Sequence, residues 1–279
     1  MTEQTERTIE HVDVPGVETL TLDIVDGTIG ILRMNRPDRM NSQTIQTFTD
    51  HLLVARHLRD SDLRSLIVTG AGERAFCAGF DLDQIDELTG MNPLQFLRFQ
   101  ETAAGGMRAL RELPFPLIAA VHGPATGGGI ALALAADIRI VAPTAKFSTA
   151  FIKVGLSIGE LGVSYNLTRL IGPARASEIG FTGRLVGAEE AVRIGLANKM
   201  VDSDALLDEA LAMADQIAAN SPGGVRLSKT AIQRNQEIGS YAAALELENR
   251  GQALATRTSD MAEALDAFKN KRPPSFTGS

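Results

Sequence analysis

Cysteine is nearly absent from this sequence. Cys77 is the only cysteine among its 279 residues. A single thiol excludes an intrachain disulfide, and it also excludes a cysteine-rich zinc site. The chain therefore fits a reducing compartment, and we expect a cytoplasmic protein that holds no metal.

Basic charge and long apolar runs are lacking as well. The formal net charge is -7, and a nucleic-acid surface needs clustered Lys and Arg, so nucleic acid is not an expected partner. The longest apolar stretches, such as 130–136, are too short to cross a bilayer. Residues 1–11 are polar, and we expect neither a signal peptide nor a membrane anchor there.

Apolar residues as a class are nevertheless plentiful. They make up 44% of the chain, which is enough for a chain of this length to bury a large core. Disorder and small disulfide-type scaffolds are therefore excluded. We expect one domain with an appendage, or two closely packed domains.

Strand-like and helix-like segments alternate before residue 201. Asp26-Gly27 is a hairpin turn signal, and two later apolar runs each lead into a segment that contains glycine. The alternation predicts an α/β fold, in which ligands gather outside the C-terminal ends of strands. The expected strands are 19–23, 29–34, 65–69 and 115–121, and the expected helices are 42–58 and 130–136.

Two glycine-bearing segments indicate a catalytic site. They are Phe76-Cys77-Ala78-Gly79-Phe80-Asp81 and His122-Gly123-Pro124-Ala125-Thr126-Gly127-Gly128-Gly129. Each presents backbone N–H groups that no side chain obstructs. Two converging N–H groups stabilise the negative oxygen that develops when a thioester carbonyl reacts. The pair therefore predicts an oxyanion hole.

The sequence beyond Val201 becomes almost wholly helical. Ser203 or Asp204 can cap a helix with one apolar stripe, and further helices are expected at about 225–237, 241–256 and 260–268. We divide the chain into a polar N-terminal extension (1–18), a core (19–201) and a helical C-terminal region (202–279).

An ordered set of motifs resembles the crotonase (enoyl-CoA hydratase/isomerase) superfamily. The set spans roughly residues 19–277 in family order, which makes it far more specific than one glycine motif. Its members are Asn35-Arg36-Pro37 with Asn41, Ala75-Phe76-Cys77-Ala78-Gly79, Gly127-Gly128-Gly129, Ala136-Asp137-Ile138, Leu170-Ile171-Gly172, Thr182-Gly183-Arg184, Gly195-Leu196-Ala197 and Phe268-Lys269-Asn270-Lys271-Arg272-Pro273.

This resemblance implies a spiral of ββα units, a helical C-terminal region that builds homotrimers or hexamers, and an acyl-CoA thioester substrate of fatty acid metabolism. Coenzyme A is then part of the substrate, and no separate cofactor is expected. The two N–H groups that hold the thioester oxygen map onto Phe80 and Gly128. Since Gly128 opens a helix, its N–H lies at the positive end of the helix dipole.

The resemblance breaks at the two catalytic glutamates of typical enoyl-CoA hydratases. They correspond here to Ala131 and Phe151, which cannot transfer protons. Glu160 falls where several isomerase-type members carry a proton-moving acid. We therefore expect Glu160 to transfer the proton that converts a 3-enoyl-CoA into a 2-enoyl-CoA. Alternatively, Glu160 has a structural role as an acid in the first turn of a helix, where the helix dipole favours negative charge.

Three alternatives remain open. Glu160 alone could activate water for hydration of a 2-enoyl-CoA. The dehalogenase branch has a nucleophilic aspartate at the position of Glu160, but its base is usually a histidine, and the sequence has none between Leu58 and Val121. The third alternative is an acyl-CoA-binding protein without catalysis.

The resemblance also implies a path for coenzyme A. The backbone around Arg39, Met40 and Asn41, with Ala78 and Phe80, should line the adenine and pantetheine; Asp81 adjoins this path in a structural role. Phe268 and Lys271 match C-terminal positions that reach a coenzyme A bound to a neighbouring subunit. Lys271 would meet a phosphate as a point charge, unless it is simply part of a solvated basic tail.

Overall fold

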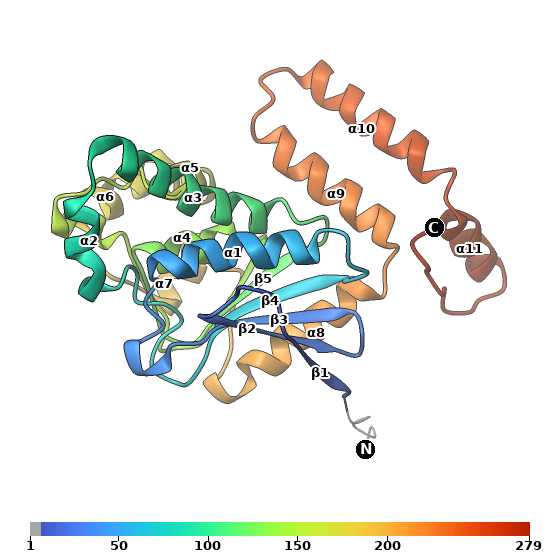
Figure 1. The fold of residues 1–279 in the computed structure, drawn as a ribbon. Coiled ribbons are helices and arrows are strands. Elements are labelled where there is room, and N and C mark those ends of the chain that lie inside the picture. The colour runs from blue at the N-terminus through green and yellow to red at the C-terminus, as the bar shows by residue number, and fades with distance from the viewer. Residues whose placement is uncertain (1–6) are drawn as a thin grey trace.

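The structure is a computed structural model that describes residues 7–279. A seven-stranded sheet runs through its centre in the order β1-β2-β3-β4-β5-β7-β10 (Figure 1). Strands β1 to β3 pair antiparallel, and all later neighbours are parallel. The strands are β1 (Ile9–Val12), β2 (Leu20–Val25), β3 (Ile29–Met34), β4 (Ser65–Gly70), β5 (Leu117–Val121), β7 (Ile138–Val141) and β10 (Lys199–Met200). The predicted α/β class is confirmed.

The predicted hairpin is confirmed at β2 and β3. Asp26 and Gly27 both have positive φ, 49° and 69°, which glycine and aspartate tolerate better than most residues. Strand β1 lies within the segment that we assigned to a polar extension. It pairs with β2 through Ile9 to Val12, so that part of the segment joins the sheet.

Helices cover both faces of this sheet. On β4, Leu66 and Val68 belong to the core beneath α1 (Ile45–Leu58) and α3 (Pro93–Arg111). Ile67 points to the opposite core, which includes Leu206 of α8 (Leu206–Ala218), because successive strand side chains alternate between faces. Helix α8 therefore packs on the sheet, although the sequence grouped it with the C-terminal region.

A smaller three-stranded sheet adjoins the second glycine segment. It consists of β6 (Pro124–Thr126), β8 (Lys146–Ser148) and β9 (Val186–Gly187) in the order β6-β8-β9. The other helices of the body are α2 (Ile85–Gly90), α4 (Gly128–Ala135), α5 (Val163–Ile171), α6 (Pro173–Thr182) and α7 (Ala188–Arg193), with short 3-10 turns η1 (Pro37–Arg39), η2 (Leu82–Gln84), η3 (Ala150–Val154) and η4 (Ser203–Ala205).

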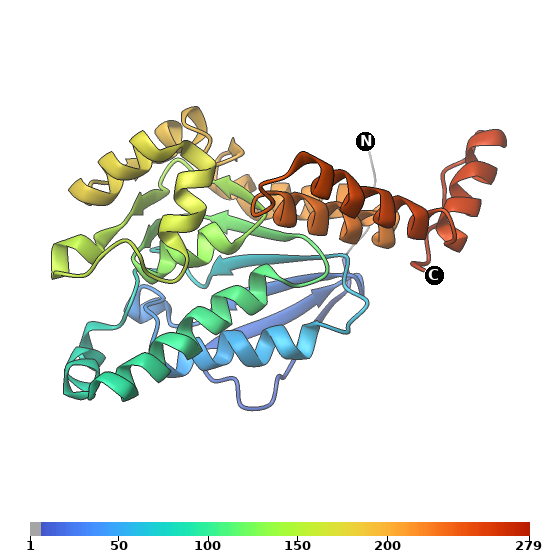
Figure 2. The ribbon, with the colours of Figure 1, turned by 90° about the horizontal axis from the view of Figure 1, so that it is seen from above.

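Three C-terminal helices extend away from this body, as Figures 1 and 2 show. They are α9 (Pro222–Asn235), α10 (Tyr241–Ala255) and α11 (Ser259–Lys269), which confirms the predicted helical segments. Lys229 anchors α9, because its buried ammonium donates to the Phe115 carbonyl and the Asp137 carboxylate, each at 2.8 Å. Within residues 7–279, no helix is long and apolar enough to cross a membrane.

Candidate active site

The two glycine-bearing segments meet at one edge of the central sheet. Strands β4 and β5 are parallel neighbours, so the segments that follow their C-terminal ends emerge side by side. Cys77 forms a parallel bridge with Ala125. The Cys77 N–H donates to Pro124 at 3.0 Å, and the Thr126 N–H donates back to Cys77 at 3.1 Å. The juxtaposition that the sequence predicted is therefore confirmed.

Glycine is required where the loops touch. Gly79 has a φ of 100°, and a β-carbon there would lie 2.9 Å from the Thr126 carbonyl oxygen and 3.6 Å from the Gly127 Cα. Gly127 also has positive φ, at 53°. Both residues directly precede the predicted donors, which brings Phe80 and Gly128 close to one another.

The N–H groups of Phe80 and Gly128 are the predicted oxyanion donors. Gln43 pairs with Phe80 through a bridge whose hydrogen bonds use the flanking residues Gly79 and Asp81, so the Phe80 N–H points away from that pairing. Gly128 is the first residue of α4, where an N–H has no partner within the helix. In residues 7–279, neither group donates to a protein oxygen, so both remain available to a ligand oxygen.

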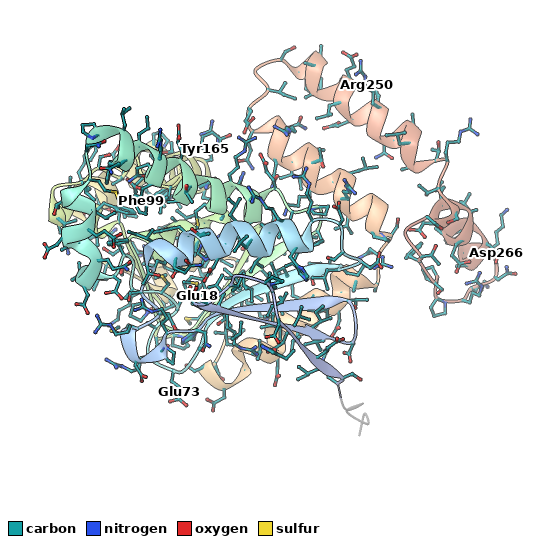
Figure 3. The ribbon with its side chains drawn as sticks, in the orientation of Figure 1. Glu18, Glu73, Phe99, Tyr165, Arg250 and Asp266 are labelled. Carbon is teal, nitrogen blue, oxygen red and sulfur yellow. The ribbon has the colours of Figure 1, made fainter. Side chains whose placement is uncertain are left out.

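An aromatic cluster lines one side of Phe80. The Phe48 ring stacks on Phe80 at 6.4 Å between centroids, and the Phe99 ring packs edge-on against it at 6.2 Å. Phe99 lies on α3, where Figure 3 labels it. Rings of this kind form an apolar wall that suits an acyl chain.

Glu160 lies in the turn before α5 and is half-buried. Burial raises the pKa of its carboxyl group, and the neighbouring Gln100 amide partly counters this shift. Leu161, the next residue, extends to within 3.8 Å of the β-carbon position on Gly128. Glu160 is therefore next in sequence to a residue that borders the second donor, and its role in proton transfer stays a prediction.

The positions of the two missing glutamates are apolar and closed. Ala131 is buried on α4, and Phe151 is buried in η3. The Phe151 ring lies 3.8 Å from the β-carbon position on Gly127. In residues 7–279, no cluster of three His, Cys, Asp or Glu side chains could hold a metal.

The residues expected along the coenzyme A path gather around the first glycine segment. The Ala78 N–H donates to the Met40 carbonyl at 3.0 Å, and the Asn41 amide donates to Ala75 at 2.8 Å. Arg39 reaches Asp81 at 3.3 Å. The structure therefore brings Arg39, Met40, Asn41 and Ala78 together beside Asp81, as the sequence predicted, while their contact with coenzyme A stays a prediction.

Asp81 is fully engaged within the protein. Its buried carboxylate accepts from Arg36 at 2.7 Å and from the Ser42 hydroxyl at 3.1 Å. It also accepts from the Asp83 N–H at 3.1 Å and thereby caps η2. These bonds fit the structural role that we expected of Asp81.

Phe268 lies on α11, and Lys271 lies just beyond the end of that helix, in the projecting C-terminal region. Phe268 is 84% exposed, and Lys271 follows the end of α11 with positive φ. Within a single chain, neither side chain joins the cluster of residues at the glycine segments. Their contact with a neighbouring subunit's ligand stays a prediction.

The sequence reasoning missed Gln43. We assigned it to the helix at 42–58, but that helix begins at Ile45, because Thr44 and Thr47 form a capping box. Gln43 is therefore extended and pairs with Phe80. The Thr-x-x-Thr spacing was the available signal, since it places the N-cap at Thr44, directly after Gln43, and the first helical residue at Ile45.

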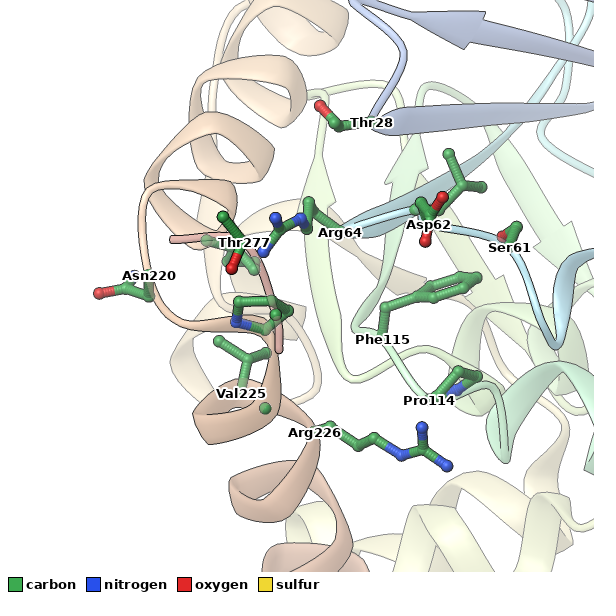
Figure 4. A pocket seen from close by; sticks show the side chains of 15 residues that line it. Thr28, Ser61, Asp62, Arg64, Pro114, Phe115, Asn220, Val225, Arg226 and Thr277 are labelled. Atoms are coloured by element: carbon green, nitrogen blue, oxygen red, sulfur yellow. The ribbon is translucent and has the colours of Figure 1, made fainter. Parts of the chain in front are cut away.

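A separate cavity of about 410 Å³ lies at the other edge of the sheet (Figure 4). Arg64 and Phe115, which line it, precede β4 and β5. The glycine segments follow the opposite ends of these strands. This cavity is therefore distinct from the candidate active site.

Comparison with known proteins shows the family of this chain. The family model for enoyl-CoA hydratase/isomerase matches residues 25–279. A probable enoyl-CoA hydratase of Mycobacterium leprae (strain TN) is 39% identical over 264 residues, covering 92% of this chain and 89% of the relative. The 1,2-epoxyphenylacetyl-CoA isomerase of Escherichia coli (strain K12) is also 39% identical over 264 residues, covering 92% and 98%.

A solved structure gives the same result. The enoyl-CoA hydratase from Bacillus anthracis superposes with a TM-score of 0.88 at 33% identity, covering 94% of this chain and all of that one. The crotonase-type fold that the motifs predicted is therefore confirmed. The chain is an enzyme that belongs to the enoyl-CoA hydratase/isomerase family.

Proposed function

We propose that this enzyme moves a carbon–carbon double bond in an acyl-CoA thioester, from the 3-enoyl to the 2-enoyl position. One observation carries the proposal: within residues 7–279 the Phe80 and Gly128 N–H groups have no hydrogen-bond partner and lie on touching loops, and Leu161, which follows the half-buried acid Glu160, borders Gly128. A site of this composition suits chemistry in which a thioester oxygen gains negative charge while one acid carries a proton.

The reaction needs a single proton carrier. The Glu160 carboxylate takes a proton from C2 of the 3-enoyl thioester, and the electron pair moves onto the thioester oxygen as a dienolate. The Phe80 and Gly128 N–H groups stabilise that oxygen. The same carboxyl group returns the proton at C4, which leaves the double bond between C2 and C3. Burial raises the pKa of Glu160 and so strengthens it as a base.

Two features favour this reaction over two-carboxylate hydration. Ala131 and Phe151 occupy the positions of the two hydratase glutamates, and both are buried. Neither can position or activate water. A water molecule would therefore depend on Glu160 for both activation and proton delivery.

The experiment is to incubate the purified enzyme separately with 3-enoyl-CoA and 2-enoyl-CoA and to follow both products. We expect conversion of the 3-enoyl to the 2-enoyl isomer, and Glu160→Gln should lower its rate by about 10²- to 10⁴-fold. Glu101→Gln, an exposed change on α3, is the matched control. Unchanged turnover in Glu160→Gln would overturn the assignment of the proton carrier.

Hydration is the second candidate, because several relatives are named enoyl-CoA hydratases. In that reaction Glu160 would activate water for addition to a 2-enoyl-CoA. Fast hydration without measurable isomerisation would favour this candidate. If neither substrate reacts but both bind, the chain has kept the binding site without either reaction.

We also propose that the enzyme assembles as a homotrimer or as a dimer of trimers. The projecting helices α9 to α11 expose several large apolar side chains, and exposed apolar patches usually mark interfaces. They are Ile232, Tyr241, Leu245, Leu254, Met261, Leu265 and Phe268. In that assembly Phe268 and Lys271 would reach the coenzyme A of a neighbouring subunit. Light scattering of the purified protein tests the assembly state.

A further inference from the structure

Gln43 lies beside both residues that carry the proposed oxyanion donors, Phe80 and Gly128. The residue is fully buried. Within residues 7–279, neither its carboxamide oxygen nor its nitrogen has a hydrogen-bond partner. Burying an unpaired amide opposes folding, so such a group requires an explanation.

The backbone of Gln43 fixes where this side chain starts. Its N–H donates to the Gly79 carbonyl at 2.7 Å, and its carbonyl accepts from the Asp81 N–H at 2.8 Å. These two bonds bracket Phe80. The residue therefore holds the first donor in place through its backbone.

The side chain reaches the second donor. The Gln43 carboxamide occupies the space that a β-carbon on Gly128 would fill, and Leu161 borders the same space at 3.8 Å. The amide thus lies among Phe80, Gly128 and the residue that follows Glu160. This location is next to the thioester end of the proposed substrate.

The chemistry of the amide selects its partner. A carboxamide has donors on nitrogen and an acceptor oxygen. A thioester oxygen could accept only, which would leave the amide oxygen unpaired. A hydroxyl group can accept from the nitrogen and donate to the oxygen. The Phe48, Phe80 and Phe99 rings cannot supply such a group from the protein side.

We propose that Gln43 is a specificity-determining residue that binds a hydroxyl group on C2 or C3 of the acyl chain. Hydroxyacyl-CoA thioesters then bind more tightly than acyl-CoA thioesters that lack the hydroxyl. The inference rests on the proposed acyl-CoA site, but it does not depend on the proton shift by Glu160.

Binding rather than turnover tests the proposal. Calorimetric titration in a Glu160→Gln background compares butyryl-CoA with 2-hydroxybutyryl-CoA and 3-hydroxybutyryl-CoA, so that no reaction consumes the ligand. We expect one hydroxy compound to bind at least about 10-fold more tightly than butyryl-CoA. Failure of the isomerase reaction would leave this comparison unaffected.

Gln43→Met, of similar size, should abolish the preference. Its affinity for the hydroxy compound should fall about 10-fold, while the affinity for butyryl-CoA stays the same or rises. Gln252→Met, an exposed change on α10, is the matched control. Equal weakening of both ligands by Gln43→Met, or no preference in the parent protein, would overturn the proposal. Gln43→Leu provides a second apolar variant, and if neither variant folds, the parent comparison decides.

Discussion

Gly79 and Thr126 approach so closely that a β-carbon on Gly79 would stand 2.9 Å from the Thr126 carbonyl oxygen. Real β-carbons essentially never come this near to a backbone oxygen. The φ of 100° at Gly79 adds a second constraint, because other residues rarely adopt it. The spacing of the two glycine-bearing loops therefore depends on the absence of one side chain.

Gly79→Ala should push the loops apart and displace the Phe80 N–H. We expect turnover of acyl-CoA substrates to fall by about 10²- to 10³-fold, the usual cost of losing one oxyanion donor. Gly105→Ala is the control, because a β-carbon at that position on α3 has nothing within 4 Å. Steady-state kinetics of both variants give the test, and full activity in Gly79→Ala would contradict the assigned geometry.

Asp81→Asn should weaken the connection between the Arg36–Ser42 stretch and the first glycine loop. Burial opposes ionisation of Asp81, but hydrogen bonds from Arg36, the Asp83 N–H, Ser42 and Arg39 outweigh it and lower the pKa to about 2. A shift of this size corresponds to about 1–2 kcal/mol of stability after allowance for the exposed partners. We expect the free energy of unfolding at pH 7 to fall by that amount.

The pH dependence of this effect has a definite sign. Because the folded pKa of Asp81 lies below its unfolded value, the stabilisation is present above about pH 4 and is lost as the pH falls toward 2. Denaturation curves of the parent and of Asp81→Asn should therefore converge in that window. Asp83→Asn, at a more exposed neighbour of Arg39, is the control. If the difference in free energy of unfolding between the parent and Asp81→Asn were as large at pH 2 as at pH 7, the ionised Asp81 carboxylate would not be its source.

The sequence was sufficient for the elements that depend on local patterns. Buried runs such as 65–69 predicted strands, and the glycines that follow predicted the loops. Parallel strands then required the loops to meet at one edge. The position of α8 was harder to predict from the sequence. Its apolar stripe shows that one side of the helix is buried, but it does not show which face of the sheet the helix covers.

Gln43 shows why part of the site escaped prediction. Its pairing partner, Phe80, lies far along the chain, and no local pattern reports a bridge between separate loops. The same holds for Asp81, whose hydrogen-bond and ion-pair partners Arg36, Arg39 and Ser42 come from a different loop. Contacts of this kind follow from the fold and cannot be read from residue spacing.

Lys229→Met tests how α9 is held to the body. The substitution leaves the Asp137 carboxylate without its counter-charge and the Phe115 carbonyl without a donor. Breaking one side of a buried pair is strongly destabilising, so we expect the free energy of unfolding to fall by about 3 kcal/mol. Chemical denaturation measures the loss.

The exposed pair of Lys199 with Glu209 is the matched comparison for Lys229. Lys199→Met should cost no more than about 1 kcal/mol, because solvent screens surface ion pairs. Adding Asp137→Asn to Lys229→Met should recover part of the stability. If Lys199→Met and Lys229→Met lowered the free energy of unfolding equally, burial would not strengthen the contribution of the Lys229–Asp137 pair.

The titration of Glu160 links the proposed chemistry to stability. Burial raises its pKa, so the carboxyl group stays protonated to a higher pH than an exposed glutamate does. Proton abstraction needs the carboxylate, and kcat/KM should therefore fall as the pH drops through this raised pKa. Glu160→Gln should lose this acid limb together with about 10²- to 10⁴-fold of its turnover.

Stability should respond in the opposite direction. A pKa raised by folding means that the native state holds its proton more tightly, so Glu160 lowers stability as the pH rises from about 4 through the folded pKa. Glu160→Gln should then unfold at a higher temperature than the parent at pH 7, and at the same temperature at pH 3. Glu101→Gln should change neither property. A loss of turnover without the gain in stability would mean that Glu160 is not held in the desolvated site that makes it an effective base.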